Sequence, residues 1–218
     1  MCFSAQADVL GGIVVGAIGV DVIRHVDHRR NYLAFAWLPL LLAAHQLVEA
    51  FVWWGLRGDV SAQVGHLATW VYLLFAFVVL PIYIPVAVFR LEPPGPRRQR
   101  ITPFIGLGAV VAGLLLAAMV RGPVTAEVGH YHLSYGIGLD SGFLIIAAYV
   151  LATCGSLIFS GYRPVAVYGV VNLIAVAVLA RLTIDGFASL WCGWAAICAG
   201  AIALQLRYGG RNRSLALT

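Results

Sequence analysis

The sequence predicts an all-α fold, a polytopic bundle of seven transmembrane helices whose N-terminus lies outside and whose C-terminus is cytoplasmic. Of the 218 residues, 61% are hydrophobic and 11% are charged, whereas soluble domains carry about 25% charged residues. The mean hydropathy of +0.91 leaves too little polar surface to cover a soluble globule. Apolar stretches recur along the whole chain, and arginine is concentrated in every second connection between them.

Seven apolar segments come close to the roughly 20 residues that a helix needs to span the hydrocarbon of a bilayer. They are Ala5–Ile23, Leu33–Leu56, Val64–Val88, Ile101–Val120, Gly142–Phe159, Val165–Leu182 and Phe187–Leu206. We expect a single transmembrane domain over residues 1–218, with a cytoplasmic connector at 91–101 and a long outer loop at 121–142. The connector contains Pro93-Pro94, which cannot continue a helix.

The arginines give the orientation. One set of connections, together with the C-terminal tail, holds Arg24, Arg29, Arg30, Arg90, Arg97, Arg98, Arg100, Arg163, Arg207, Arg211 and Arg213, and the opposite set holds Arg57, Arg121 and Arg181. Basic residues favour the cytoplasmic side, so we expect the N-terminus outside and the C-terminus inside. The start of the chain lacks the basic region of a cleavable signal peptide, so the first apolar segment is expected to stay in the mature protein.

Composition also excludes two classes of protein. The chain has no lysine, so it cannot bind retinal through a Schiff base. The net charge of +5 is held by arginines at helix ends, which favours membrane orientation over nucleic-acid binding. The lipid bilayer is therefore the expected partner, and nucleic acid is not.

Polar residues within the second span form the strongest candidate site. His45, Glu49 and Trp53 recur at i, i+4 and i+8, so they share one face of a helix, and Gln46 lies beside them. This spacing suits metal coordination or acid–base chemistry, and Glu49 is the candidate catalytic residue. The alternative is a hydrogen-bonded pair that holds helices together.

The last two spans contribute further candidates. Asp185, Ser189 and Cys192 share one face of the last span, and Asn172 lies in the sixth. We expect Asp185 to be catalytic and the other three to line a pocket. Alternatively, Asp185 pairs with Arg181 and Cys192 only packs.

The predicted outer side also carries candidate ligands for zinc or another divalent metal. His130 and His132 alternate in the long loop, His66 opens the third span, and Cys2 follows the initiator Met. Removal of Met1 would give Cys2 an amine beside its thiol, a pair that binds soft metals. Asp8 lies near the start of the first span, where the helix dipole favours an anion and Ser4 can cap the helix, so we expect a structural role for Asp8.

Several stretches resemble an uncharacterised family of bacterial membrane proteins that open with Met-Cys-Phe-Ser-Ala. They are MCFSA, HQLVEAFVWWGL, RGPVTAEVGHYHLSY, YVLATCGSL and SLWCGWAA, and the likeness runs the whole length of the chain. The resemblance implies seven helices in a bacterial inner membrane, a domain of unknown function and no known reaction. Members of this family usually carry Gln-Gln before the glutamate and Gly after it. This chain has His45-Gln46 and Ala50 instead, a departure that favours Glu49 over His45 as the essential residue.

Two functions, and one structural role, fit these residues. The first function is a metal-dependent, membrane-embedded hydrolase of a lipid or amphiphile, in which Glu49 or Asp185 acts as the general base. In architecture alone this reading resembles the seven-helix zinc amidases of the alkaline ceramidase type, whose paired histidines on the last helix are absent here. The second is a small-molecule transporter or receptor with a polar intramembrane pathway. The third is an accessory membrane subunit whose polar groups only join helices.

Overall fold

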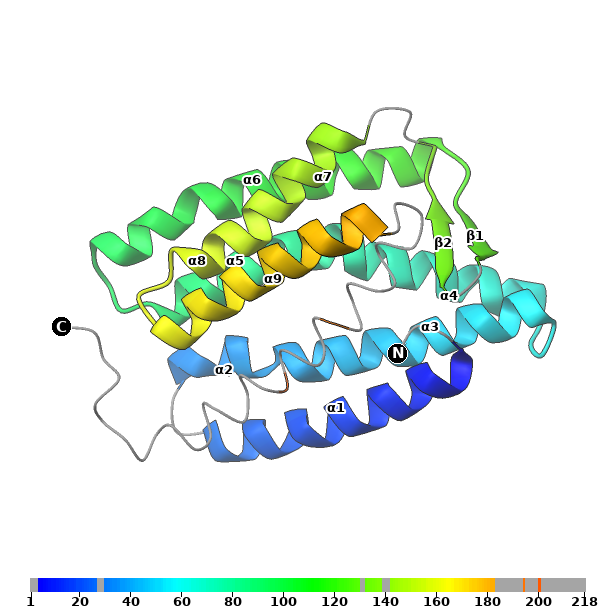
Figure 1. Ribbon diagram of the computed structural model, residues 1–218, viewed down its shortest axis with the longest axis horizontal. Coiled ribbons are helices and arrows are strands. Elements are labelled where there is room, and N and C mark those ends of the chain that lie inside the picture. The colour runs from blue at the N-terminus through cyan, green and yellow to red at the C-terminus, as the bar shows by residue number, and fades with distance from the viewer. Residues whose placement is uncertain are drawn as a thin grey trace.

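The computed structural model describes residues 4–26, 30–129, 132–138, 142–182, 194 and 200, and most of them are helical (Figure 1). Two π-helical turns, η1 (Phe75–Val79) and η2 (Leu151–Gly155), interrupt longer helical segments. The α-helices in the described part are α1 (Ala5–Val26), α2 (Arg30–Ala36), α3 (Leu38–Arg57), α4 (Ala62–Leu74), α5 (Leu80–Leu91), α6 (Pro96–Arg121), α7 (Phe143–Val150), α8 (Ser156–Ile158) and α9 (Arg163–Leu182).

Four helices are long and apolar enough to cross a membrane, and they correspond to the first four predicted spans. They are Ala5–Val26, Asn31–Arg57, Ala62–Leu91 and Pro96–Arg121. Two shorter apolar helices, Phe143–Ile158 and Arg163–Leu179, lie at the fifth and sixth predicted spans. The seventh predicted span, 187–206, lies outside the described residues except for Trp194 and Gly200, which are helical.

The surface of the bundle is apolar, which suits a lipid environment. Leu10 on α1 and Phe143 on α7 are 65% and 80% exposed. Several charged and amide side chains are instead fully buried between the helices. Apolar residues outside and polar residues inside are what a bilayer solvent selects.

The ends of the helices follow from local sequence. The Ser4 hydroxyl accepts a hydrogen bond from the N–H of Ala7 (3.3 Å) at the start of α1, which confirms the predicted cap. The Ser61 hydroxyl caps α4 in the same way by accepting from the N–H of Val64 (3.4 Å). Gly58 ends α3 with φ +82°, a left-handed conformation that glycine adopts without steric cost.

Two prolines explain why the helix 62–91 is irregular in its middle. Pro81 and Pro85 lack the N–H that an α-helix needs four residues after each carbonyl, and the π-helical turn η1 lies just before them. The Tyr149 hydroxyl, on the neighbouring helix α7, donates a hydrogen bond to the carbonyl of Ala76 within η1 (2.8 Å). This bond satisfies a backbone acceptor in the irregular turn, where hydrogen bonding is weakest.

Adjacent helices approach closely where glycine faces backbone. A Cβ on Gly55 of α3 would overlap the Cα of Gly65 of α4. A Cβ on Gly108 of α6 would overlap the Pro81 carbonyl oxygen of α5. Small residues of this kind let membrane helices pack backbone to backbone.

The all-α prediction missed a short β-hairpin in the long loop after α6. Strands β1 (Thr125–Val128) and β2 (Leu133–Gly136) pair antiparallel, with Ala126 opposite Tyr135 and Glu127 opposite Ser134. The N–H of Gly129 donates to the carbonyl of His132 (2.8 Å) and closes the turn. Each strand has only four residues, too few for alternation of polar and apolar side chains to be distinguished from an irregular loop.

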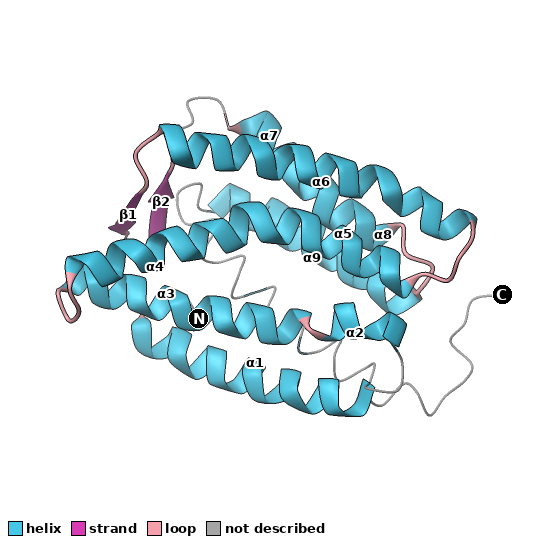
Figure 2. Ribbon diagram, turned by 180° about the vertical axis from the view of Figure 1, so that it is seen from behind, coloured by secondary structure: helices cyan, strands magenta, loops and turns pink. Residues whose placement is uncertain are grey.

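The connections are sorted to the two ends of the bundle (Figures 1 and 2). The hairpin and the α3–α4 loop lie at one end. The α5–α6 and α8–α9 connections lie at the other end, where α1 ends and α2 begins, so the arginine-rich segments of the described part are grouped together.

Candidate functional site

A cluster of polar side chains is buried near the hairpin end of the bundle, between α1, α3 and α4. Asp8, Gln46 and Glu49 have no exposed surface, and His45 is 3% exposed. Asp8 lies in the first turn of α1, whereas the other three lie near the middle of α3. We call these four residues the polar cluster.

Close packing of α1 on α3 brings Asp8 to the level of Glu49. A Cβ on Gly12 would lie 2.8 Å from the Leu47 side chain, and a Cβ on Gly19 would lie 3.0 Å from the backbone nitrogen of Leu40. The two helices run in opposite directions (Figure 1), so the turn before Gly12 lies beside the turn after Leu47. Asp8 accordingly lies within electrostatic range of the Glu49 carboxyl group, with the Trp53 indole beside it.

A column of stacked rings joins the polar cluster to the hairpin. The His45 ring stacks on Tyr72 of α4, with 4.0 Å between centroids and 14° between planes. Tyr72 stacks in turn on Tyr135 of β2, at 4.6 Å and 17°. The Tyr135 hydroxyl then donates a hydrogen bond to Glu49 Oε1 (3.4 Å). The hairpin therefore contacts the polar cluster directly, although 86 residues separate Glu49 from Tyr135.

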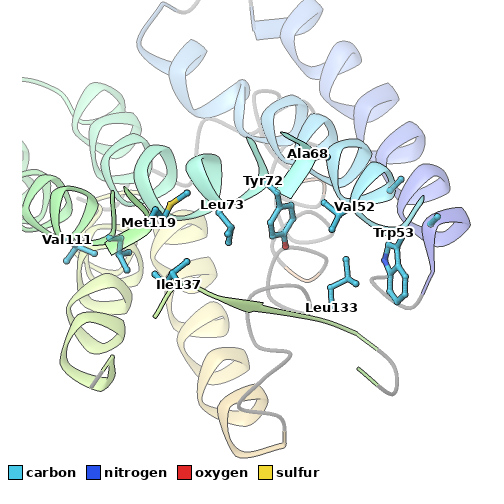
Figure 3. Packing of buried hydrophobic residues seen from close by; sticks show 12 residues of the cluster. Val52, Trp53, Ala68, Tyr72, Leu73, Val111, Met119, Leu133 and Ile137 are labelled. Carbon is cyan, nitrogen blue, oxygen red and sulfur yellow. The ribbon is translucent and has the colours of Figure 1, made fainter. Parts of the chain in front are cut away.

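Apolar packing holds the hairpin in this position. Leu133 of β2 is completely buried in one hydrophobic cluster with Val52, Trp53 and Tyr72. Figure 3 shows Leu133 projecting from the strand toward Val52 and Trp53, with the Tyr72 ring close by. Gly138, which follows β2, has φ +66°, so glycine is required where the chain leaves the hairpin.

Two members of the polar cluster have no hydrogen-bond partner among the described residues. Neither ring nitrogen of His45 and neither carboxyl oxygen of Asp8 is paired there, and the indole nitrogen of Trp53 is also unpaired. Leaving a buried polar atom unsatisfied costs about 1–3 kcal/mol. These atoms are therefore the ones in the cluster available to bind a proton or a small ligand.

The structure brings together four of the predicted site residues, namely His45, Gln46, Glu49 and Trp53 on α3. It does not bring the described histidines of the predicted metal site to them. His66 is exposed on α4, where its ring lies 6.5 Å from that of Trp70. His132 is half-buried at the hairpin turn.

The remaining predicted residues divide into two groups. Asn172 is buried on α9, and its side-chain oxygen has no hydrogen-bond partner in the described part of the chain. Cys2, His130, Asp185, Ser189 and Cys192 lie outside the described residues. Within the described ranges, no group of three or more His, Cys, Asp or Glu side chains could hold a metal ion.

Sequence reasoning missed Tyr72 and Tyr135 and gave Asp8 only a structural role. The pairing of Asp8 with Glu49 left a usable signal, because Gly12, Gly16 and Gly19 form a stripe of small residues that predicts close helix contact. The tyrosines left no such signal, since their stacking depends on where a loop folds back onto distant helices.

A second buried carboxylate, also missed, lies at the arginine-rich end. Glu92 Oε1 accepts hydrogen bonds from the Ser160 hydroxyl and the Gly161 N–H, both 2.7 Å long. Burial, followed by the neighbouring Tyr32 and Glu92, raises the pKa of Tyr162, so its hydroxyl stays neutral. These contacts tie the α5–α6 connection to the α8–α9 connection and fit a structural role.

The fold and site together define a helical protein with four helices long and apolar enough to cross a membrane and with buried polar groups between them. The chain belongs to DUF6629, a family of unknown function, whose model matches residues 1–216. No curated protein and no solved structure matches the chain.

Proposed function

We propose that the chain crosses the membrane seven times, with the N-terminus outside and the C-terminus in the cytoplasm, in a bacterial inner membrane. Four long apolar helices, two shorter ones and the apolar segment 187–206 together supply seven spans. The grouping of arginine-rich connections at one end of the bundle supports this orientation, because basic connections stay in the cytoplasm.

Reporter fusions test this topology. We expect a reporter active only in the cytoplasm to work when fused after Thr218 and to be silent when inserted into the α3–α4 loop. A reporter active only in the periplasm should give the opposite pattern. Activity of the periplasmic reporter at the C-terminus would contradict the proposed topology.

For the activity, we propose a small-molecule transporter or receptor with a polar intramembrane pathway. The observation that carries this proposal is the polar cluster itself. It extends along α3 from Glu49, about 12 Å from Arg57 at the helix end, to His45, about 18 Å from it, at 1.5 Å per residue. Ionisable groups that deep in a spanning helix are costly and mark pathways for solutes or protons.

Ligand-dependent stabilisation of the purified protein tests this activity. The detergent-purified protein would be melted with a panel of organic acids, amines, sugars and inorganic cations, beside a Glu49→Gln variant. A compound that raises the melting temperature of the wild-type protein but not of the variant supports the proposal. A panel that stabilises both proteins equally would contradict a role for the polar cluster.

One observation favours the hydrolase as a second candidate. The hairpin that carries His132 also contacts Glu49 through Tyr135, so this histidine and the candidate base belong to one structural unit. Zinc or another divalent metal would there activate a water molecule for attack on a lipid or amphiphile. Since the described residues supply no three-ligand group, the ligands would have to include a residue outside them, and Cys2, His130 and Asp185 are the predicted candidates.

Elemental analysis separates the two candidates. A stoichiometric metal that a His130→Ala/His132→Ala variant loses would favour the hydrolase. Wild-type protein that carries no metal after purification without chelators would remove it.

A first prediction concerns the contact between hairpin and polar cluster. We expect Tyr135→Phe to lower the free energy of unfolding by about 1 kcal/mol, because it removes one hydrogen bond to a carboxyl group and keeps the ring that stacks on Tyr72. Thermal melting in detergent measures the effect. A melting temperature equal to that of the wild-type protein would mean that the hydroxyl contributes nothing to holding the hairpin.

A further inference from the structure

We infer that Asp8 and Glu49 form a proton-binding pair, in which the two carboxyl groups together hold one proton at neutral pH. In this state one group is a carboxylic acid and the other a carboxylate, and protonation from water adds one O–H bond. The inference deepens the proposed function, on which it rests, because it names the proton as a ligand of the polar cluster.

Burial and proximity carry the inference. Neither side chain has exposed surface, and the close contact of α1 with α3 at Gly12 holds the two carboxyl groups within electrostatic range of each other. The Asp8 oxygens form no hydrogen bond of normal geometry with a described residue, although the Trp53 indole lies beside them. Two adjacent carboxylates in an apolar site cannot both stay ionised, because burial and mutual repulsion act in the same direction.

Among the described residues, the charged groups around the pair lie on α1, α3, α4 and the hairpin. The Arg57 guanidinium lies over the Trp53 ring, 5.2 Å from its centroid. The other titratable or charged groups on the packed elements are His45 on α3, Asp21, Arg24 and His25 at the far end of α1, Tyr72 and the exposed His66 on α4, and the exposed Glu127, half-buried His132 and Tyr135 on the hairpin.

Tyr135 provides a hydrogen-bond donor to one member of the pair, Glu49. Its hydroxyl donates to Glu49 Oε1, and a hydrogen-bond donor stabilises the ionised form of a carboxyl group. In the described part of the chain the Trp53 indole is the donor beside Asp8, and it forms no hydrogen bond of normal geometry with the Asp8 oxygens. The geometry therefore assigns the proton to Asp8 and the negative charge to Glu49.

Infrared spectroscopy of the purified wild-type protein tests the pair. At neutral pH we expect the carbonyl stretch of a neutral carboxylic acid, shifted when the sample is exchanged into D₂O. The band should disappear in an Asp8→Asn/Glu49→Gln double variant, whose side chains keep the shape of the originals. The control is Glu127→Gln, which removes an exposed carboxyl group from the hairpin and should leave the band unchanged.

Three results would overturn the inference. They are the absence of the band from the wild-type protein, its persistence in a double variant that elutes and melts as a folded protein, and its loss in Glu127→Gln. If the double variant does not fold, Asp8→Asn alone replaces it and should remove the band. Carboxylate bands alone, with a melting temperature that rises in NaCl or MgCl₂, would assign the pair to a metal cation instead.

The infrared measurement detects the protonated carboxyl group directly and does not depend on any transport or ligand-binding assay. A carboxylic acid band in a protein that no compound stabilises would remove the transporter or receptor proposal and leave the pair. If a compound stabilised the protein but the carboxylic acid band were absent, the proton-binding pair would be ruled out and the transporter or receptor proposal would remain.

Discussion

Gly108→Val is expected to prevent α5 and α6 from packing and to lower the free energy of unfolding by about 3 kcal/mol or more. Any Cβ at this position would collide with the backbone carbonyl oxygen of Pro81. Backbone cannot rotate away as a flexible side chain can, so the two helices would have to separate. Because Gly108 and Pro81 lie in neighbouring long helices, their separation would also displace the π-helical turn η1. Thermal melting and the yield of monodisperse protein in detergent measure the effect.

Gly113→Val provides a matched control on the same helix. A Cβ on Gly113 would meet nothing within 4 Å, and the residue is exposed. Replacing glycine within a helix usually gains up to about 1 kcal/mol, so this variant should melt at or slightly above the wild-type temperature. If Gly108→Val and Gly113→Val lowered the free energy of unfolding equally, glycine would act through the conformation of α6 itself and not through its contact with α5.

Hydropathy predicted the four long apolar helices because the constraint that sets them is local. A helix that crosses a bilayer must be apolar over roughly 20 consecutive residues, and Ala62–Leu91 satisfies this whether or not its neighbours are known. The hairpin did not leave such a signal. Its strands are only four residues long, and they are stabilised by Leu133 and Tyr135 packing on distant helices.

The same distinction separates the parts of the site. His45, Gln46, Glu49 and Trp53 lie on one helix, so a period of 3.6 residues was enough to group them. Asp8 reaches this group only through the crossing of α1 and α3 at Gly12, and its place at a helix N-terminus suggested a local role. Helix periodicity was therefore enough to predict the helix that carries the site, whereas the residues that pack against it are set by tertiary contacts that the sequence pattern does not show.

These partners change what Glu49 is able to do. An isolated glutamate in a spanning helix needs only a donor, and Tyr135 supplies one. A glutamate beside a second buried carboxyl group is also coupled to that group's protonation. Binding of a cationic group or a proton at one carboxyl therefore alters the charge on the other, and the stacked rings extend this contact to the hairpin.

Glu49→Gln is expected to leave the fold intact and to abolish function. The amide keeps the shape of the carboxyl group and can accept the hydrogen bond from Tyr135, so the free energy of unfolding should change by less than about 1 kcal/mol. A ligand at a hundredfold excess over its Kd stabilises a protein by about 2.7 kcal/mol, or roughly 5–10 °C for a domain of this size. We expect the wild-type protein to show a rise of this size with a bound compound and the variant to show none.

Glu127→Gln is the control, since it makes the same chemical change at an exposed position on the hairpin. It should keep both the melting temperature and the response to the compound. If Glu49→Gln also kept the full response, Glu49 would be a structural residue that joins α3 to the hairpin. If Glu49→Gln instead failed to fold while Glu127→Gln folded, the negative charge of Glu49 itself would be needed to hold the bundle together, and the amide would not be an adequate replacement for it.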